Sequence, residues 1–372
     1  MEYNKFLSEK LNIKLPLWTL FFPVIAVFTL FIKGTFTENT FYLIFLGVIL
    51  ITAVLSAVHH AEVIAHKVGE PFGTIILAVA IAVIEVSLIV SLMMSEGNEQ
   101  PSALARDTVF AAIMIILTGI IGLCLWSGGY KYKQQDYRQQ GVSAALITLI
   151  AISMLTLVLP NYTTTEAGSV YSDKQLIFVA IISLVLYGGF ISMQTIRHRD
   201  FFLPKKEDIN HDESEHADPP SLPTTITSLI LLILALVAVV LLSKKLSPAI
   251  ESMVIEMGAP MSLVGIIIAA VILLPEGMAA WRAAQNNRLQ TSLNLALGSA
   301  LASIGLTIPA VAIVSYFTGM TVTLGIDAKS TLLLILSLFT VYSSLHSGKT
   351  NILQGIVLLV IFATYLFTTI VP

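Results

Sequence analysis

The chain has 372 residues, of which 56% are hydrophobic and only 12% are charged, and its formal net charge is −3. Soluble domains carry roughly 25% charged residues, so this composition excludes a soluble globular protein. Because the apolar runs are continuous and do not alternate with polar residues, they exclude a transmembrane β-barrel. The sequence therefore predicts an all-α polytopic membrane protein, and its mean hydropathy of +0.87 agrees with that class.

About eleven membrane-spanning helices are predicted, because each apolar run is long enough to cross a hydrocarbon core of about 30 Å. In chain order they cover residues 16–33, 41–61, 71–95, 107–126, 141–160, 173–195, 224–243, 258–281, 291–317, 329–345 and 351–371. The first is interpreted as a retained helix and not as a signal peptide, since no small-residue cleavage site follows it. The single cysteine, Cys124, excludes an intramolecular disulfide.

The Lys and Arg residues predict how these helices are oriented. If the N-terminus is cytoplasmic, fourteen of the 20 Lys and Arg residues fall on the cytoplasmic side and six on the external side. Positively charged residues accumulate on the cytoplasmic side of membrane proteins. We therefore expect a multi-pass protein of the plasma membrane with a cytoplasmic N-terminus, surrounded by the lipid bilayer and without a nucleic-acid partner.

The order of the spans predicts an internal duplication. Residues 1–40 would form the N-terminus and first helix, 41–195 a first five-helix repeat, 196–223 an acidic cytoplasmic loop, and 224–372 a second five-helix repeat. Because five is an odd number of spans, the two repeats cross the membrane in opposite directions, which is the inverted-repeat arrangement of many transporters.

The loop between the repeats is rich in acidic residues and histidine. Such a segment buries little apolar surface and is typical of a solvated linker. A second interpretation stays open, namely a low-affinity cytoplasmic cation sensor, because hard cations prefer oxygen ligands. The residues of such a sensor would be Glu207, Asp208, His211, Asp212, Glu213, Glu215, His216 and Asp218.

Two glutamates, Glu85 and Glu276, lie deep inside apolar runs, where a carboxylate is expensive and usually functional. The 12-residue stretches that end at them, 74–85 and 265–276, share five identities when aligned without gaps. Desolvation disfavours the charged form of a buried carboxyl group, and a cation between two carboxylates favours it. Protons and a cation would then compete for the same oxygens, as an antiporter requires. We expect Glu85 and Glu276 to form this site at the interface of the repeats.

Neutral oxygen atoms on neighbouring helices are candidates for supporting ligands. The hydroxyl groups of Ser and Thr in such helices often bond to their own backbone, so a packing role is the alternative for each of them. The candidate supporting residues are Ser87, Thr118, Asn294, Ser299 and Ser303.

The cluster of His59, Glu62 and His66 permits a different hypothesis. On a helix these residues share one face, which suggests a metal site and a metal-dependent membrane enzyme. No His-Glu-x-x-His arrangement is present, so the alternative of an ordinary polar helix end is favoured.

The chain resembles the Ca²⁺:cation antiporter superfamily and, within it, the bacterial ChaA-type calcium/sodium/potassium–proton antiporters. The resemblance covers nearly the whole chain and rests on segments 58–73, 82–88, 104–108, 274–277 and 294–309. It implies eleven helices, two inverted halves with an acidic stretch between them, and a cation-binding role for Glu85 and Glu276. It also implies a transport role for Glu70. No cofactor is expected.

The sequence departs from the family at one point. The proton-exchanging branch carries Gly-Asn-x-x-Glu in each half, whereas this chain has Ile81-Ala82 and Ile272-Leu273 at the Gly-Asn positions. Ca²⁺ prefers six to eight oxygens, so loss of two amide carbonyls predicts weaker and less selective binding. We therefore expect a non-enzymatic antiporter that exports Ca²⁺, and Na⁺ or K⁺, against H⁺, with a passive cation channel as the alternative.

Overall fold

The computed structural model describes residues 15–32, 40–69, 72–96, 102–203, 219–256, 258 and 260–371. Within them, eight helices are long and apolar enough to cross a membrane, and three shorter apolar helices accompany them, at Leu17–Leu30, Ile76–Ser91 and Ala328–Ser344. Their positions match the eleven predicted spans and confirm an all-α polytopic fold. Glu70 and the proposed sensor residues between 207 and 218 lie outside the described residues.

The chain divides into two compact units, and each contains segments from both predicted repeats. The first unit comprises Met1–Ser95 and Asp212–Ser252, and the second comprises Glu96–His211 and Met253–Pro372. The helices that fall wholly or mainly in the first unit are α2 (Leu17–Leu30), α3 (Thr40–Val68), α4 (Phe72–Glu96) and α9 (Leu222–Glu256).

Helix α9 is longer than the sequence predicts. The apolar run ends at Lys244, yet the helix continues to Glu256. The ammonium group of Lys245 donates to the Tyr42 hydroxyl at 2.8 Å and to the Ile32 carbonyl at 3.2 Å. These bonds satisfy the charge within the first unit, so Lys245 continues the helix instead of ending it.

A proline in α2 determines how α2 is held against α3. Pro23 has no N–H, so the carbonyl of Thr19 loses its normal intrahelical donor. Two buried side chains of α3 replace that donor: the Ser56 hydroxyl donates at 3.0 Å, and Nε2 of His60 lies 2.9 Å away. His60 is fully buried, and its other ring nitrogen has no hydrogen-bond partner among the described residues. His60 therefore has a structural role as the neutral Nε2–H tautomer.

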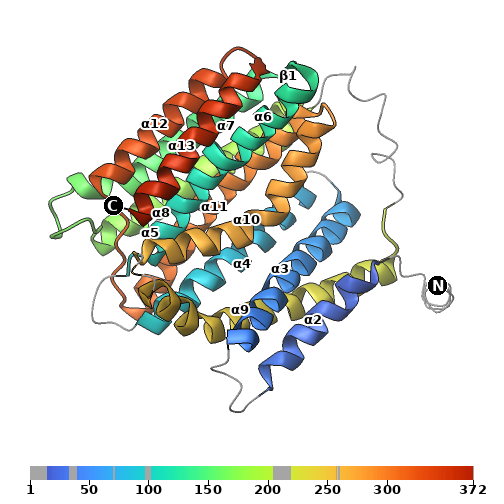
Figure 1. Ribbon diagram of the computed structural model, residues 1–372, viewed down its shortest axis with the longest axis vertical. Helices are drawn as coiled ribbons and strands as arrows, with labels where there is room; N and C mark the ends of the chain where they lie inside the picture. The colour runs from blue at the N-terminus through green and yellow to red at the C-terminus, as the bar shows by residue number, and fades with distance from the viewer. Residues whose placement is uncertain are drawn as a thin grey trace. The chain divides into compact units, whose positions relative to one another are not determined.

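The second unit contains the remaining helices and a short sheet. Several of its helices run side by side in Figure 1, and three of the described helical spans contain π-helical turns. In chain order the elements are α5 (Leu104–Met114), η1 (Ile115–Ile120), α6 (Ile121–Tyr132), β1 (Gln134–Asp136), α7 (Gln139–Ser153), η2 (Met154–Val158), η3 (Leu159–Tyr162), α8 (Asp173–Ser192), η4 (Met193–Arg197), η5 (Arg199–Phe201), α10 (Ser262–Gln285), α11 (Leu289–Thr318), α12 (Ala328–Ser344), β2 (Lys349–Asn351) and α13 (Ile352–Ile370).

One end of the second unit, here called the sheet end, is formed by connections that are far apart in sequence. Strand β1 pairs antiparallel with β2, with Gln135 opposite Thr350. The Gln135 amide donates to the Ala284 carbonyl and to Asn287 Oδ1, both at 3.0 Å. The connections before α7, α11 and α13 therefore meet at one end of the unit.

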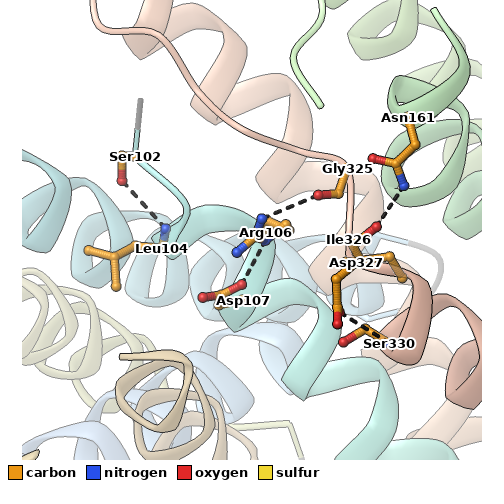
Figure 2. A network of polar contacts seen from close by, with 9 residues as sticks. All are labelled: Ser102, Leu104, Arg106, Asp107, Asn161, Gly325, Ile326, Asp327 and Ser330. Atoms are coloured by element: carbon orange, nitrogen blue, oxygen red, sulfur yellow. Dashed lines mark hydrogen bonds and ion pairs between the residues drawn. The ribbon is translucent and has the colours of Figure 1, made fainter. Parts of the chain in front are cut away.

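The opposite end, here called the loop end, is organised by residues 319–327. Thr323 pairs with Val170, Ser102 N–H donates to the Thr321 carbonyl at 3.1 Å, and the Arg106 guanidinium donates to the Gly325 carbonyl at 3.2 Å (Figure 2). Burial raises the pKa of Tyr171 to about 12. Its hydroxyl therefore stays protonated and donates to the Leu155 carbonyl in η2 at 2.6 Å.

The two ends mirror each other in the way that an inverted repeat requires. At the sheet end, the connection after the third span of the first repeat pairs with the connection after the fourth span of the second. At the loop end, the connection after the third span of the second repeat pairs with the connection after the fourth span of the first. Helix contacts follow the same rule, since α6 packs on α13 and α11 packs on α8.

Small residues permit the closest of these helix contacts. A Cβ atom at Gly355 of α13 would collide with the backbone of Trp126 in α6. At the corresponding contact between α11 and α8, a Cβ at Gly305 would lie 2.8 Å from Cβ of Tyr187. Close backbone approach through small residues is the common way in which membrane helices associate.

We expect Gly355→Ala to destabilise the protein by about 1–3 kcal/mol, because the added methyl group overpacks the α6–α13 contact. Gly188→Ala in α8 is the matched control, since a Cβ there has open space. Thermal unfolding of the detergent-solubilised protein measures both. Equal melting temperatures for the two variants would contradict the role assigned to Gly355.

We expect His60→Ala to cost about 1–3 kcal/mol, because it removes a buried donor from the Thr19 carbonyl. His66→Ala, which changes an exposed histidine of the same helix, should have little effect. In a Pro23→Ala background the backbone N–H is restored, so the cost of His60→Ala should shrink. A double-mutant cycle on melting temperature measures this coupling, and strict additivity would argue against it.

Candidate cation and proton site

Glu85 lies in α4 of the first unit, and it is 2% exposed. The apolar side chains of Ile84 and Leu88 beside it in sequence are buried to a similar degree. A carboxyl group in such surroundings is costly unless it is protonated or holds a cation. The structure thus places Glu85 where the sequence predicts it, inside a membrane-spanning helix. Ser87, two residues further along, is half-buried.

Glu276 lies in α10 of the second unit, directly after Pro275, and it is half-buried. Pro275 has no N–H to donate to the carbonyl of Val271, four residues earlier. The Val271 carbonyl oxygen is therefore an acceptor without its regular helical donor, within about 7.5 Å of helix rise from Glu276. Freed carbonyls of this kind coordinate cations in transporters with discontinuous helices.

A π-helical segment packs next to this part of α10. A Cβ at Gly277 would lie 3.0 Å from Cδ1 of Ile120, so Gly277 allows η1 to approach α10 closely. Thr118 of the same segment is fully buried, and its hydroxyl donates to the Met114 carbonyl at 2.5 Å. The proton of Thr118 is thus committed to its own helix, while a lone pair of its oxygen remains to accept. Single π-turns are frequent at functional sites.

Helix α11, which also contacts α10, carries hydroxyl groups on one face. Ser299, Ser303 and Thr307 are spaced by four residues and so lie one above another. Ser299 is half-buried, Ser303 is 4% exposed and Thr307 is fully buried. The Thr307 hydroxyl has no hydrogen-bond partner among the described residues. This stripe offers neutral oxygens within the second unit.

Asn294 is engaged in a different set of contacts. Its amide donates to the Phe202 carbonyl at 2.6 Å, and its oxygen accepts from the Gln290 amide at 2.9 Å. Both polar atoms of the side chain therefore have partners: one bond joins α11 to Phe202 after η5, and the other lies within α11. These bonds give Asn294 a packing role near the start of α11.

The histidine cluster of α3 does not form a metal site in the described part of the chain, where no group of three or more His, Cys, Asp or Glu side chains could hold a metal ion. His60, which the sequence pattern does not single out, makes the key bond to α2 instead. Glu62 and His66 are exposed. The hypothesis of a metal-dependent enzyme has no support in this geometry.

Two features escape the sequence reasoning. The Val271 carbonyl is one, although Pro275 already signals it, because any proline inside a helix frees the carbonyl four residues before it. The other is a polar network at the loop end, in which Arg106 lies between Asp107 and Gly325 while Asp327 caps α12 (Figure 2). Arg106 and Asp107 are more than 200 residues away from Gly325 and Asp327, so no local pattern predicts the network.

A family model described as sodium/calcium exchanger protein matches residues 38–196 and 227–371. The chain belongs to this family. Among its relatives, the protein y4hA of Sinorhizobium fredii is 44% identical over 368 residues, 96% of this chain and 97% of its own. The sodium-potassium/proton antiporter ChaA of Escherichia coli is 35% identical over 354 residues, 94% of this chain and 95% of its own.

Solved structures of exchangers share the fold. The native structure of YfkE has a TM-score of 0.69 at 15% identity, covering 95% of this chain and 98% of its own. The H⁺/Ca²⁺ exchanger CAX also has a TM-score of 0.69 at 15% identity, covering 94% of this chain and 86% of its own. At 15% identity this likeness shows a shared fold and does not identify the ion that the protein transports.

Proposed function

We propose that the protein is a secondary active cation/proton antiporter that exports Ca²⁺, and Na⁺ or K⁺, in exchange for H⁺. The observation that carries the proposal is the occurrence of Glu85 and Glu276 in matching sequence frames inside the membrane-spanning helices α4 and α10. The name of the 35% identical relative, a sodium-potassium/proton antiporter, supports it.

The mechanism follows from competition for oxygen atoms. Without a cation, protons neutralise the two buried carboxyl groups, because a desolvated carboxylate is unfavourable. An arriving cation favours the charged form of both groups and displaces the protons. Since the same oxygens serve both substrates, protons and cation occupy the site alternately, and that alternation couples the two fluxes.

The inverted repeat supplies the second requirement, access from either side in turn. Transporters built from inverted repeats alternate by moving one bundle against the other around a fixed site. The mirrored ends of the second unit support this mode. A passive channel would need an open pathway through the molecule, and the named relatives and solved neighbours described as antiporters or exchangers favour coupled exchange.

The proposed orientation places the N-terminus and the sheet end in the cytoplasm of a prokaryotic cell, and the loop end outside its plasma membrane. The excess of Lys and Arg in the connections that we assign to the cytoplasm supports this orientation. The acidic loop would then be cytoplasmic, where the proposed cation sensor could respond to the ion to be exported.

The proposed selectivity follows from the ligands that the chain retains. With apolar residues in place of both family Asn ligands, the cation would rely on Glu85, Glu276, water and neutral oxygens such as the Val271 carbonyl and the Thr307 hydroxyl. A site with few fixed ligands binds Ca²⁺ weakly and discriminates modestly against monovalent ions. Glu70 and Ser87 are proposed as further transport residues.

We expect Glu85→Gln and Glu276→Gln each to reduce exchange by about 100-fold or more. An amide cannot bind a proton and a cation in turn, and the substitution also removes one charged ligand of the cation. Everted vesicles report this as cation-dependent collapse of a proton gradient. Glu62→Gln, an exposed carboxylate on α3, is the matched control and should retain full exchange. Full exchange in either of the first two variants would refute the proposed mechanism.

We expect Na⁺ and Ca²⁺ to be exchanged at comparable rates, each with an apparent affinity that improves as pH rises. The sign follows from competition, since fewer protons occupy the carboxyl groups at higher pH. Fluorescence-monitored exchange with Ca²⁺, Na⁺, K⁺ and Mg²⁺ across a pH series measures both effects. A tight Ca²⁺-only site, or flux without proton movement, would count against this prediction.

A further inference from the structure

A cavity of about 200 Å³ opens at the loop end of the second unit, apart from Glu276. The helices α5, α10, α12 and α13 all contribute to its wall. Its charged lining residues are Arg106, Asp107, Asp327 and Lys329, and Tyr365 lies among them. With two positive and two negative side chains, the lining carries no net formal charge.

The two cationic side chains are already held by oxygen atoms of the protein. The Arg106 guanidinium lies 2.7 Å from Oδ1 of Asp107 and donates to the Gly325 carbonyl at 3.2 Å (Figure 2). The Lys329 ammonium donates to the Thr368 carbonyl at 2.7 Å. Both are therefore anchored to the rim by bonds to backbone carbonyls and do not depend on a ligand.

Each of the two carboxylates makes hydrogen bonds through only one of its oxygens within the described residues. Asp107 is bonded to Arg106 through Oδ1, and Asp327 accepts the Ser330 N–H through Oδ1 at 3.2 Å. The Oδ2 atom of each makes no hydrogen bond within the described residues. A carboxylate has about four lone-pair sites, so each group keeps acceptor capacity towards the cavity that both of them line.

Tyr365 gives an independent indication of a missing partner. Its side chain is 4% exposed and its ring packs edge-on against Phe110, whereas its hydroxyl makes no hydrogen bond in the described part of the chain. A tyrosine whose ring is buried normally has a partner for its hydroxyl. The carboxylates of Asp107 and Asp327 and the side chain of Tyr365 thus line one cavity of about 200 Å³.

We propose that this cavity is a second, weaker cation site, in which Asp107, Asp327 and Tyr365 hold a partly hydrated Ca²⁺ or alkali cation. Carboxylate, hydroxyl and water oxygens are the ligands that hard cations prefer. The nearby Arg106 and Lys329 charges oppose tight binding, so affinity falls at the weak end of calcium sites, about 10⁻⁴–10⁻³ M.

The position of the cavity links it to the transport helix. The backbone of Asp107 packs on Gly265 of α10, where a Cβ would lie 2.9 Å from the Asp107 carbonyl carbon. Eleven residues, about 16 Å of helix rise, separate Gly265 from Glu276. This inference rests on the proposed antiport and its orientation. In that orientation the cavity lies on the external side of the membrane, where it would bind the cation that has been exported.

Binding of Tb³⁺, a luminescent substitute for Ca²⁺, tests the site without requiring transport. The purified Glu85→Gln/Glu276→Gln variant lacks the proposed transport carboxylates, so tyrosine-sensitised luminescence that remains reports other sites. We expect Asp107→Asn and Asp327→Asn each to weaken this binding about 10-fold or more, the effect of losing one charged contact. Tyr365→Phe should remove most of the sensitised signal, and excess Ca²⁺ or Na⁺ should compete.

Asp173→Asn is the matched control, since this exposed carboxylate at the start of α8 does not line the cavity. Asp327→Asn keeps an N-cap acceptor for α12, so it decides the matter if Asp107→Asn fails to fold. Unchanged luminescence in Asp327→Asn, or no signal in the double Gln variant, would overturn the site. Exchange by the wild type is measured separately, so the proposed function can fail or stand independently.

Discussion

The constraint on which this structure depends is that a backbone polar group inside a membrane must find its partner within the protein. At two interruptions in the described helices, a side chain from elsewhere in the chain supplies a hydrogen bond. Ser56 and His60 bind the Thr19 carbonyl that Pro23 frees, and the Tyr171 hydroxyl binds the Leu155 carbonyl in a π-turn. Pro275 frees the carbonyl of Val271, five residues before Glu276, and the proposed function uses it as an additional oxygen ligand.

The inverted repeat accounts for the mirrored ends of the second unit, because equivalent connections of the two repeats pair with each other. At the sheet end the pairing is a small antiparallel sheet, and at the loop end it is a bridge supported by Arg106. Glycine permits close packing at both helix contacts: Gly355 lies against the backbone of Trp126, and Gly305 lies against the side chain of Tyr187.

Charged residues are few, and the half-buried cations Lys245 and Arg106 both have oxygen partners. Helix α9 continues through Lys245 because the Tyr42 hydroxyl and the Ile32 carbonyl accept hydrogen bonds from its ammonium group. Arg106 is fixed by Asp107 and Gly325, which leaves the remaining carboxylate oxygens free to face the cavity at the loop end. If that cavity holds a cation, the protein has two sites of different strength along one helix, and the weaker one need not be selective.

The class of fold, the eleven spans and the position of the two glutamates could be predicted from the residues alone, because hydropathy and membrane thickness act locally on the chain. The inverted repeat could be predicted as well, since an odd number of spans reverses direction. Three further features become visible in the folded chain: His60 anchors α2, Asn294 is engaged in packing, and Asp107 and Asp327 line one cavity. These roles depend on partners as far as 220 positions away in sequence, and long-range packing, not local pattern, brings such residues together.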